Sequence, residues 1–305
     1  MTESRWEQPD WLAAAHAWID ARLGDLGRAR TGAVEQPHVR SWATALRVPT
    51  DAGTVWFKAS VPELGYEAAL VDVLARLDPD LVPPLLAWEP ESGWMLMEDA
   101  GATLRSAEDE STWLAGWSDV LPRCAALQVA AGDQADRLLA LGVPDLRLAT
   151  LPGRYAELLE RVPAEPRFHE AVPRVAELCA ELAAYAVPET VQHDDLHDAQ
   201  IFVADGRHRI LDWGDACVSH PLFTLAVSVE GVLAWGLHDV EGSVDVEPFV
   251  RSFLAPFEAA AGRSLAEAVP AALRLGWACR AVNGHVAGDD APTLTRLRMF
   301  LDGHP

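Results

Sequence analysis

Residues 191–215 read VQHDDLHDAQIFVADGRHRILDWGD and are the stretch that best indicates the fold of this 305-residue chain. An apolar entry is followed by a polar loop from His193 to Gln200 and by a short apolar run from Ile201 to Ala204. Asp205-Gly206 is typical of a tight turn, after which a second short run ends at Asp212. The pattern predicts a β-hairpin that brings the polar loop and Asp212 close together.

Such a hairpin suits metal-assisted chemistry. One carboxylate can lie near a nucleophile, while a side-chain carbonyl and a second carboxylate hold a hard cation, which prefers oxygen ligands. The stretch therefore predicts a catalytic site at the open end of the hairpin.

The chain as a whole is strongly acidic. It contains 24 lysine and arginine residues against 46 aspartate and glutamate residues, a net charge of −22, and half of its residues are hydrophobic. This composition is typical of a globular protein. The negative charge argues against a protein that binds nucleic acid without sequence preference or an anionic membrane surface. We therefore expect small, cationic or metal-linked partners, no nucleic acid and no membrane, and a monomer or a homodimer.

Neither a secretory leader nor a cysteine framework is indicated. The first ten residues, MTESRWEQPD, lack the apolar core of a signal peptide, so a cytoplasmic location is expected. The most apolar segment, residues 221–237, is interrupted by Glu230, which favours a buried helix over a membrane span. The cysteines show no C-x-x-C spacing and are interpreted as core thiols: Cys124, Cys179, Cys217 and Cys279.

Two regions differ in periodicity. An amphipathic helix is predicted at residues 10–24, β-type runs at 34–39, 43–48, 54–59, 85–88 and 94–97, and a helix from Pro62 to residue 77. Helices are predicted at 104–131, 133–141, 153–162, 167–186, 221–237, 246–262, 264–287 and 291–302. We therefore predict an α+β chain: a lobe of residues 1–99 with a five-stranded antiparallel sheet and a helix, and a mainly helical lobe of residues 100–305.

Lys58 is the only lysine among the 24 basic residues, and it lies in the third predicted β-run. A lysine ammonium is a compact point charge suited to a phosphate group, which an arginine fork does not simply replace. A phosphate contact and a chance survivor in an arginine-rich chain are both compatible with this one observation.

The polar loop resembles the catalytic loop of the aminoglycoside phosphotransferase and choline kinase-like family, which is related to protein kinases. The pattern H-x-D-x-x-x-x-N is matched by His193 and Asp195, with Gln200 where asparagine is usual, and Asp212 matches the aspartate of the D-F-G motif. The resemblance implies a protein-kinase-like, two-lobed fold and transfer of a γ-phosphoryl group from ATP, or from GTP, to a hydroxyl of a small molecule.

The resemblance also implies roles for individual residues. Asp195 would act as the base toward the acceptor hydroxyl, and His193 would brace the loop. Asp212 and Gln200 would bind Mg²⁺, with Mn²⁺ as an alternative, because glutamine is one methylene longer than asparagine. The implied nucleotide contacts are Lys58 on the phosphates, its helix partner Glu67 with Glu63 as an alternative, Ser41 in the phosphate cover, and Met97, Glu98 and Ala100 in the hinge strand.

The acceptor is less clearly indicated. Residues 186–250 hold 12 acidic residues and two arginines, an excess that favours an amine-bearing acceptor such as an aminoglycoside, amino sugar or amino alcohol, although a solvated acidic surface explains it equally. Candidate substrate contacts are Asp198, Asp215 and Glu230, and Trp113, Trp117, Trp235 and Trp277 fit either substrate stacking or the core. The glutamine at position 200 keeps open a nucleotide-binding pseudokinase; adenylyl transfer and amine sequestration are further alternatives.

Overall fold

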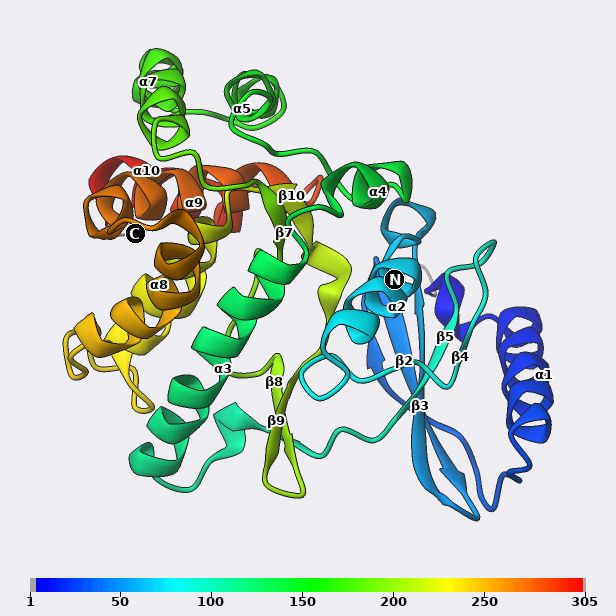
Figure 1. Cartoon of the computed structure of the whole chain (residues 1–305). Helices are drawn as coiled ribbons and strands as arrows, with labels where there is room; N and C mark the ends of the chain where they lie inside the picture. Colours follow the sequence, from blue (N-terminus) through cyan, green and yellow to red (C-terminus); the bar gives the residue numbers. More distant parts are fainter. Residues whose placement is uncertain (1–3, 304–305) are drawn as a thin grey trace. The chain divides into compact units, whose positions relative to one another are not determined.

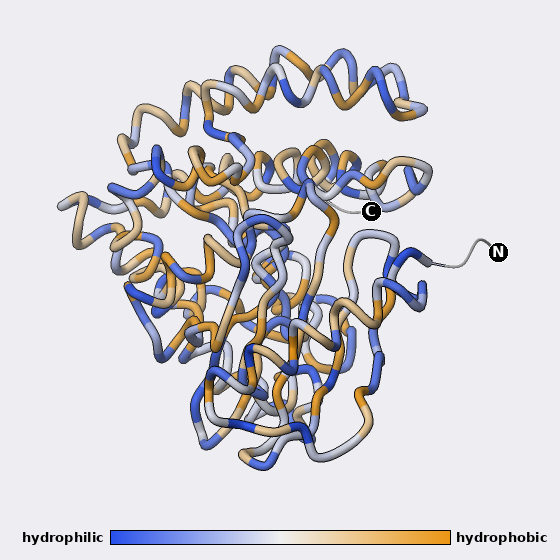
Figure 2. The backbone as a smooth tube through the Cα atoms, turned by 90° about the vertical axis from the view of Figure 1, so that its right-hand side faces the viewer, coloured by the Kyte–Doolittle hydropathy of each residue, from blue (hydrophilic) through white to orange (hydrophobic). Residues whose placement is uncertain are grey.

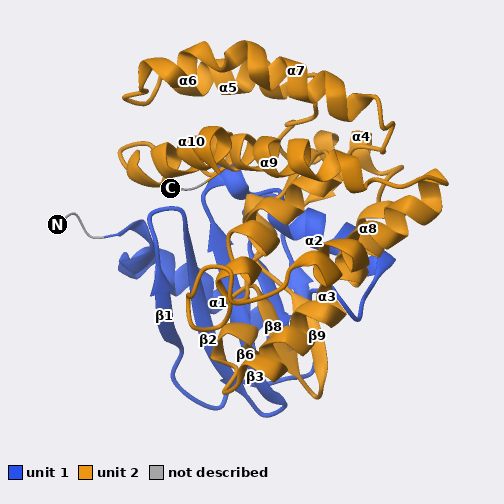
Figure 3. Cartoon of the chain, turned by 90° about the vertical axis from the view of Figure 1, so that its left-hand side faces the viewer, with its two compact units in different colours: residues 1–101 blue, residues 102–305 orange. Residues whose placement is uncertain are grey.

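The computed structural model describes residues 4–303 and divides into two compact units, residues 1–101 and 102–305 (Figure 3). The sequence analysis placed the division after residue 99, and the structure places it after Gly101. Residues 1–3 and 304–305 lie outside the described residues.

Unit 1, residues 1–101, is built on a five-stranded sheet with the order β1-β2-β3-β5-β4. Its strands are β1 (Glu35–Val39), β2 (Ala43–Thr50), β3 (Gly53–Ser60), β4 (Ala87–Trp88) and β5 (Met95–Glu98). All neighbouring strands are antiparallel, which confirms the predicted sheet. The β2–β3 hairpin pairs Ala45 with Lys58 and closes at Thr50 opposite Gly53.

The alternation along β3 separates a face buried in the core cluster from an opposite face that carries Lys58. Val55, Phe57 and Ala59 are buried in one cluster with residues of α1 (Pro9–Asp25), such as Ile19. Because successive side chains of a strand point to opposite faces, Lys58 is directed to the other face of the sheet. The cluster also uses the tryptophans that are frequent in unit 1, with edge-to-face contacts among Trp6, Trp11, Trp18, Trp94 and Phe57.

The predicted helix from Pro62 is two separate elements. A single 3₁₀ turn, η2 (Pro62–Leu64), ends at Gly65, and α2 (Glu67–Leu77) begins afterwards. Gly65 donates its backbone N–H to the carbonyl of Pro62, which closes the short turn before the longer helix starts. The break makes Glu67 the first residue of α2.

Unit 2, residues 102–305, is mainly helical (Figure 1). Its helices are α3 (Glu110–Ala130), α4 (Ala135–Ala140), α5 (Leu151–Leu159), α6 (Pro166–Glu170), α7 (Val172–Ala183), α8 (Glu247–Ala261), α9 (Val269–Asn283) and α10 (Ala291–Asp302). Helix α9 packs against α10, α7 and α5, while α3 lies along α8 (Figures 1 and 3). Hydrophobic and hydrophilic residues alternate along most of these helices (Figure 2). Helix α9 differs, because residues 276–281 are buried without interruption.

Short strands organise the centre of unit 2. The predicted hairpin is formed by β8 (Ile201–Ala204) and β9 (Arg207–Ile210), with Ile201 opposite Ile210. The sequence analysis missed β6 (Ala102–Thr103), which extends this hairpin, and β10 (Cys217–Ser219), which pairs with β7 (Thr190–Gln192). Strands of two or three residues are too short to show a period of their own.

The predicted helix at 221–237 is confirmed only in part, because residues 221–230 are helical but irregular and the helix does not continue to residue 237. The segment forms two 3₁₀ turns, η5 (Pro221–Phe223) and η7 (Leu233–Trp235), on either side of a π-helical turn, η6 (Ala226–Glu230). Gly236, with φ of 67°, ends η7 in the left-handed region, where a regular helix cannot continue. Among residues 4–303, no helix is long and apolar enough to cross a bilayer.

Candidate active site

Lys58 and Glu67 form an ion pair on the face of the unit 1 sheet opposite the core cluster. Lys58 Nζ lies 2.6 Å from Glu67 Oε1, and the two side chains are 15% and 3% exposed. Glu67 reaches the lysine because α2 starts at that residue, whereas Glu63 lies in the preceding turn and is exposed. The pairing expected with Glu67, rather than the alternative with Glu63, is the one that forms.

The candidate hinge residues Met97, Glu98 and Ala100 lie at the end of β5 or just beyond it. Strand β4 pairs only with Met95 and Leu96, so β4 does not extend along Met97 and Glu98. The Glu98 carboxylate accepts a hydrogen bond from Arg28 at 2.6 Å, and this bond raises the pKa of Arg28. Ala100 is buried just beyond β5.

Ser41 lies at the exposed tip between β1 and β2. The tip is closed by Arg40, whose backbone N–H donates to the carbonyl of Ala43.

His193 braces the polar loop of unit 2. It is fully buried, its Nε2–H donates to the carbonyl of Leu211 at 2.9 Å, and its ring lies 4.8 Å from that of Trp213. Burial lowers the pKa of His193, which favours a neutral ring. The hydrogen bond ties the start of the loop to the residue before Asp212.

Gln200 and Asp212 meet at the open end of the β8–β9 hairpin. Gln200 Nε2 donates to Asp212 Oδ2 at 3.2 Å, and the backbone N–H of Leu211 donates to the Gln200 carbonyl at 3.0 Å. Asp212 has φ of 62°, a left-handed conformation that is uncommon outside glycine and turns the chain directly after the strand. The hairpin therefore brings together the two residues that the sequence predicts to be neighbours.

Asp195 lies beside a buried arginine. Arg280 Nη2 of α9 is 2.8 Å from Asp195 Oδ1 and 3.2 Å from Asp215 Oδ2, and Arg280 Nη1 is 3.8 Å from Asp194 Oδ2. Burial acts against the charge of Arg280, but the three carboxylates outweigh it and raise the pKa of the guanidinium. The candidate base is thus part of a network of three aspartates around one arginine.

Asp194 is the fully buried carboxylate of this network. Burial raises its pKa to about 7, although Arg280 and Asn283 act in the opposite direction. Its Oδ2 accepts a hydrogen bond from Asn283 Nδ2 at 2.9 Å, and its Oδ1 accepts one from Gln192 Nε2 at 3.2 Å.

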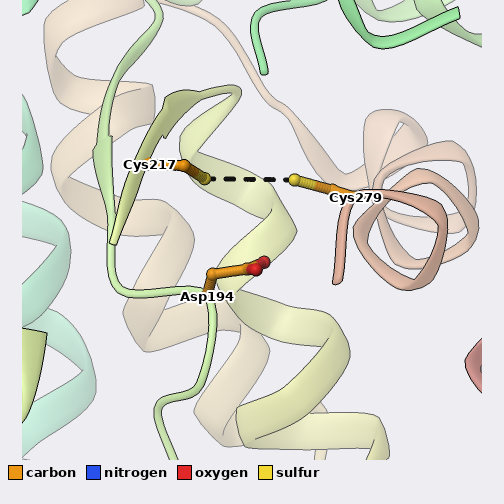
Figure 4. Close-up of side chains that lie close together, drawn as sticks. All are labelled: Asp194, Cys217 and Cys279. Atoms are coloured by element: carbon orange, nitrogen blue, oxygen red, sulfur yellow. Dashed lines mark hydrogen bonds between the residues drawn. The ribbon is translucent and has the colours of Figure 1, made fainter. Parts of the chain in front are cut away.

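Two of the four cysteines lie next to Asp194, where Cys217 and Cys279 have their sulfur atoms 4.0 Å apart (Figure 4). The Cys217 thiol donates to Gln192 Oε1 at 3.3 Å, and burial raises the pKa of both thiols. Protonated thiols bound to Gln192 fit the expected core role.

The proposed substrate contacts differ in their surroundings. The Asp198 carboxylate is buried and accepts hydrogen bonds from Arg105 Nε at 2.7 Å and Trp113 Nε1 at 3.1 Å. Glu230 accepts a hydrogen bond from Trp277 Nε1, and burial raises the pKa of Glu230. Asp215 is the most open of the three, with 39% of its side chain exposed.

Three of the four tryptophans proposed for substrate stacking are buried in unit 2: Trp113, Trp117 and Trp277. Core packing therefore accounts for them.

Arg280 and Asn283 are the site residues that the sequence analysis missed. Asn283 was noted only as too distant to replace Gln200, yet its Nδ2 also donates to the Asp215 carbonyl at 2.6 Å. Both residues end α9, 85 or more positions after Asp195. The available signal was a lone arginine in the apolar run GWACRAV, residues 276–282.

Comparisons with known proteins place these observations in a family context. The model of the phosphotransferase enzyme family matches residues 22–275. No curated protein sequence matches the chain. Solved structures that resemble it include ethanolamine kinase from Plasmodium vivax, with a TM-score of 0.65 and 12% identity over 96% of this chain and 89% of that one.

Two further structures share the architecture. Choline kinase LicA from Streptococcus pneumoniae has a TM-score of 0.64 and 16% identity, covering 95% of this chain and 98% of that one. The GDP complex of aminoglycoside 2′-phosphotransferase-IIIa has a TM-score of 0.56 and 12% identity, covering 95% and 97%. These similarities confirm the protein-kinase-like α+β fold predicted from the sequence.

Proposed function

Because the chain belongs to the phosphotransferase enzyme family, we propose that it transfers the γ-phosphoryl group of ATP to a hydroxyl of a small molecule. The observation that carries this proposal is the contact between Gln200 and Asp212, formed within the same unit as the Asp195 network. The contact supports a shared role for Gln200 and Asp212, and the motif order adds Asp195 as the third residue of the proposed transfer site. GTP is the alternative donor.

The proposed reaction assigns the proton to Asp195. The acceptor oxygen forms a bond to the γ-phosphorus while the bond from phosphorus to the β–γ bridging oxygen breaks, and that electron pair remains on ADP. The acceptor O–H bond breaks, and its proton passes to the Asp195 carboxylate. The aspartate mainly orients the hydroxyl, since catalysis of this reaction depends on positioning and electrostatic stabilisation.

The donor set at the end of the hairpin fits a magnesium ion. Asp212 offers carboxylate oxygens and Gln200 an amide oxygen, which are the ligand types that Mg²⁺ prefers. The two side chains already contact one another, so the same pair can face one cation after rotation of the amide. A bound Mg²⁺ would neutralise charge on the transferred phosphate. Asp212 and Gln200 would hold it there.

Unit 1 supplies the proposed nucleotide contacts. Lys58, oriented by Glu67, would hold the phosphates, and the backbone of Met97, Glu98 and Ala100 would bind the base. Ser41, at the exposed β1–β2 tip, would cover the phosphates in place of a glycine-rich loop.

An amine-bearing alcohol is the proposed acceptor class. The acidic residues 186–250 support it, and Asp215 is the candidate contact that remains substantially exposed. Asp198 is proposed instead to anchor the loop, because Arg105 and Trp113 already occupy its oxygens. Glu230 is a weaker candidate, since the Trp277 indole takes one of its oxygens.

The test combines binding and turnover. ATP with Mg²⁺ should raise the melting temperature of the purified protein, and ADP release should increase when an amino alcohol or aminoglycoside is added. Stabilisation by nucleotide without ADP release on any acceptor of an amine and sugar panel would contradict the proposed transfer.

A nucleotide-binding pseudokinase is the second candidate function. It is favoured by one observation: the position that usually holds asparagine carries Gln200, whose side chain is one methylene longer. In this case nucleotide should bind, and Gln200→Asn should create turnover that the natural protein lacks.

A further inference from the structure

Arg280 connects helix α9 to the polar loop and to the segment after Asp212. Only 5% of this residue is exposed, so its charge is removed from bulk water. A buried guanidinium is tolerated when carboxylates pair with it and accept its hydrogen bonds, and here Asp194, Asp195 and Asp215 surround it. Asp195 and Asp215 lie within hydrogen-bond distance of Nη2, whereas Asp194, at 3.8 Å from Nη1, contributes its charge without a hydrogen bond. The position of the arginine is therefore set mainly by two of the three carboxylates.

The same network fixes the carboxylate of Asp195 asymmetrically. Its Oδ1 lies 2.8 Å from Arg280 Nη2, at hydrogen-bond distance. Its Oδ2 lies 3.7 Å from His197 Nε2, beyond a direct hydrogen bond, and no other donor to it is found among residues 4–303. The side chain is 24% exposed, whereas that of Asp194 is fully buried. One oxygen of Asp195 is held and the other is available.

We propose that Arg280 is a positioning residue that holds Asp195 Oδ1, so that Oδ2 is presented to the acceptor hydroxyl. The inference rests on the proposed phosphotransferase function and adds a residue from α9 to it. Arg280 touches neither acceptor nor phosphate in this scheme and acts only through Asp195. Small displacements of a reacting group cost rate steeply, which makes such a clamp effective.

The backbone at the end of α9 leaves room for this guanidinium. Gly284 follows α9 directly, and a Cβ atom at that position would overlap with Arg280 Nη1 and with Arg296 Nη1. Any side chain there would displace both arginines. Glycine at position 284 thus preserves the geometry that Arg280 needs.

Arg296 provides a matched control. It lies on α10, its Nη1 donates to the Gly284 carbonyl at 2.8 Å, and no carboxylate of residues 4–303 lies within 4.0 Å of its guanidinium. It lies beside Arg280 at Gly284, although it is less buried, and it lacks the contact with Asp195. A change at Arg296 therefore reports the effect of disturbing this packing alone.

The first measurement compares Arg280→Lys with Arg296→Lys. ADP release is followed with ethanolamine, choline and kanamycin as acceptors and with water alone, in Mg²⁺-ATP. Lysine keeps the charge but cannot span the aspartates, so we expect Arg280→Lys to lower kcat by about 10²-fold. The KM for ATP should change by less than about twofold, because the mutation leaves the nucleotide contacts in place. Arg296→Lys should retain kcat within about twofold.

A double-mutant cycle separates positioning from a structural role. In an Asp195→Asn background, Arg280→Lys should have little further effect on kcat if the arginine acts through Asp195, whereas a structural defect would lower both backgrounds equally. Equal losses of kcat in both backgrounds, or an unchanged kcat in the Arg280→Lys variant, would overturn the inference about Arg280 but not the proposed function. No ADP release by the natural protein under any of the four conditions would overturn the proposed function, and the inference with it.

Discussion

The Lys58–Glu67 ion pair of unit 1 and the Arg280 network of unit 2 are built on different principles. In unit 1, Lys58 and Glu67 are nine residues apart. They meet because Lys58 lies on β3 and Glu67 is the first residue of α2, the α-helix that follows this strand. In unit 2, Arg280 is 85 positions after Asp195 and reaches it from a helix packed under the loop. A single ion pair needs only local geometry. A cluster of buried carboxylates needs a counter-charge that the fold must bring from elsewhere.

The largest loss of activity is expected from the unit 2 cluster. Asp195→Asn should lower kcat by about 10²- to 10⁴-fold, because the amide cannot accept the acceptor proton. Nucleotide affinity, measured by equilibrium titration with Mg²⁺-ATP, should stay near that of the natural protein. Asp212→Asn should instead weaken that affinity.

Asp205→Asn, at the exposed turn of the hairpin, serves as the control for Asp195→Asn. If Asp195→Asn and Asp212→Asn weakened nucleotide binding equally, the division of roles between them would be wrong.

Stability should also depend more on the unit 2 cluster. Arg280→Met leaves three aspartates without their shared cation, and breaking a buried ion pair in this way costs about 3–5 kcal/mol. Urea unfolding of the variant and of Arg296→Met measures the difference. A loss no greater for Arg280→Met than for Arg296→Met would show that the network contributes nothing specific to stability.

Substitution of Lys58 in unit 1 is expected to lower the rate of catalysis. Lys58→Met should lower kcat by about 10²- to 10³-fold, as for loss of one electrostatic donor, and Lys58→Arg should not restore it fully. Glu63→Gln is the matched control, since this exposed carboxylate does not pair with the lysine. Steady-state ADP release measures this effect. An unchanged rate in Lys58→Met would show that Lys58 does not belong to the proposed site.

The smallest effect is expected at the hairpin end. Gln200→Asn should strengthen Mg²⁺ binding by less than about tenfold, or ~1.4 kcal/mol, because asparagine shortens the amide side chain, and Gln200→Ala should weaken it. Titrations of the three proteins with Mg²⁺ and Mn²⁺, followed by ADP release, test this order. Identical metal dependence in all three would exclude Gln200 as a ligand.

The contrast between the clusters explains what the sequence could predict. The β-type run placed Lys58 in the third strand, and the hairpin pattern placed the polar loop near Asp212, because both relationships depend on local patterns. The partner of Asp195 could not be found in this way. Arg280 reaches the loop through the packing of α9 on its neighbours, which no spacing in the sequence encodes.

The segment after Asp215 shows a second limit. Its apolar composition predicted one helix to residue 237, yet the helical stretch is irregular and ends at Gly231, and only a short 3₁₀ turn follows before Gly236. Similarly, β10 has three residues and is defined by its pairing with β7 and by a bridge from Val218 to Asp145. Both features are set by tertiary contacts that outweigh local preference.

The β8–β9 hairpin also determines where the chain can be lengthened. Its register, from Ile201 opposite Ile210 to Ala204 opposite Arg207, holds the two ends together, while the tip at Asp205-Gly206 is exposed. Extra residues at that tip add only a small loop-closure entropy and leave the paired strands in place. The hairpin tip is therefore a suitable place to insert an epitope or fluorescent tag into this protein.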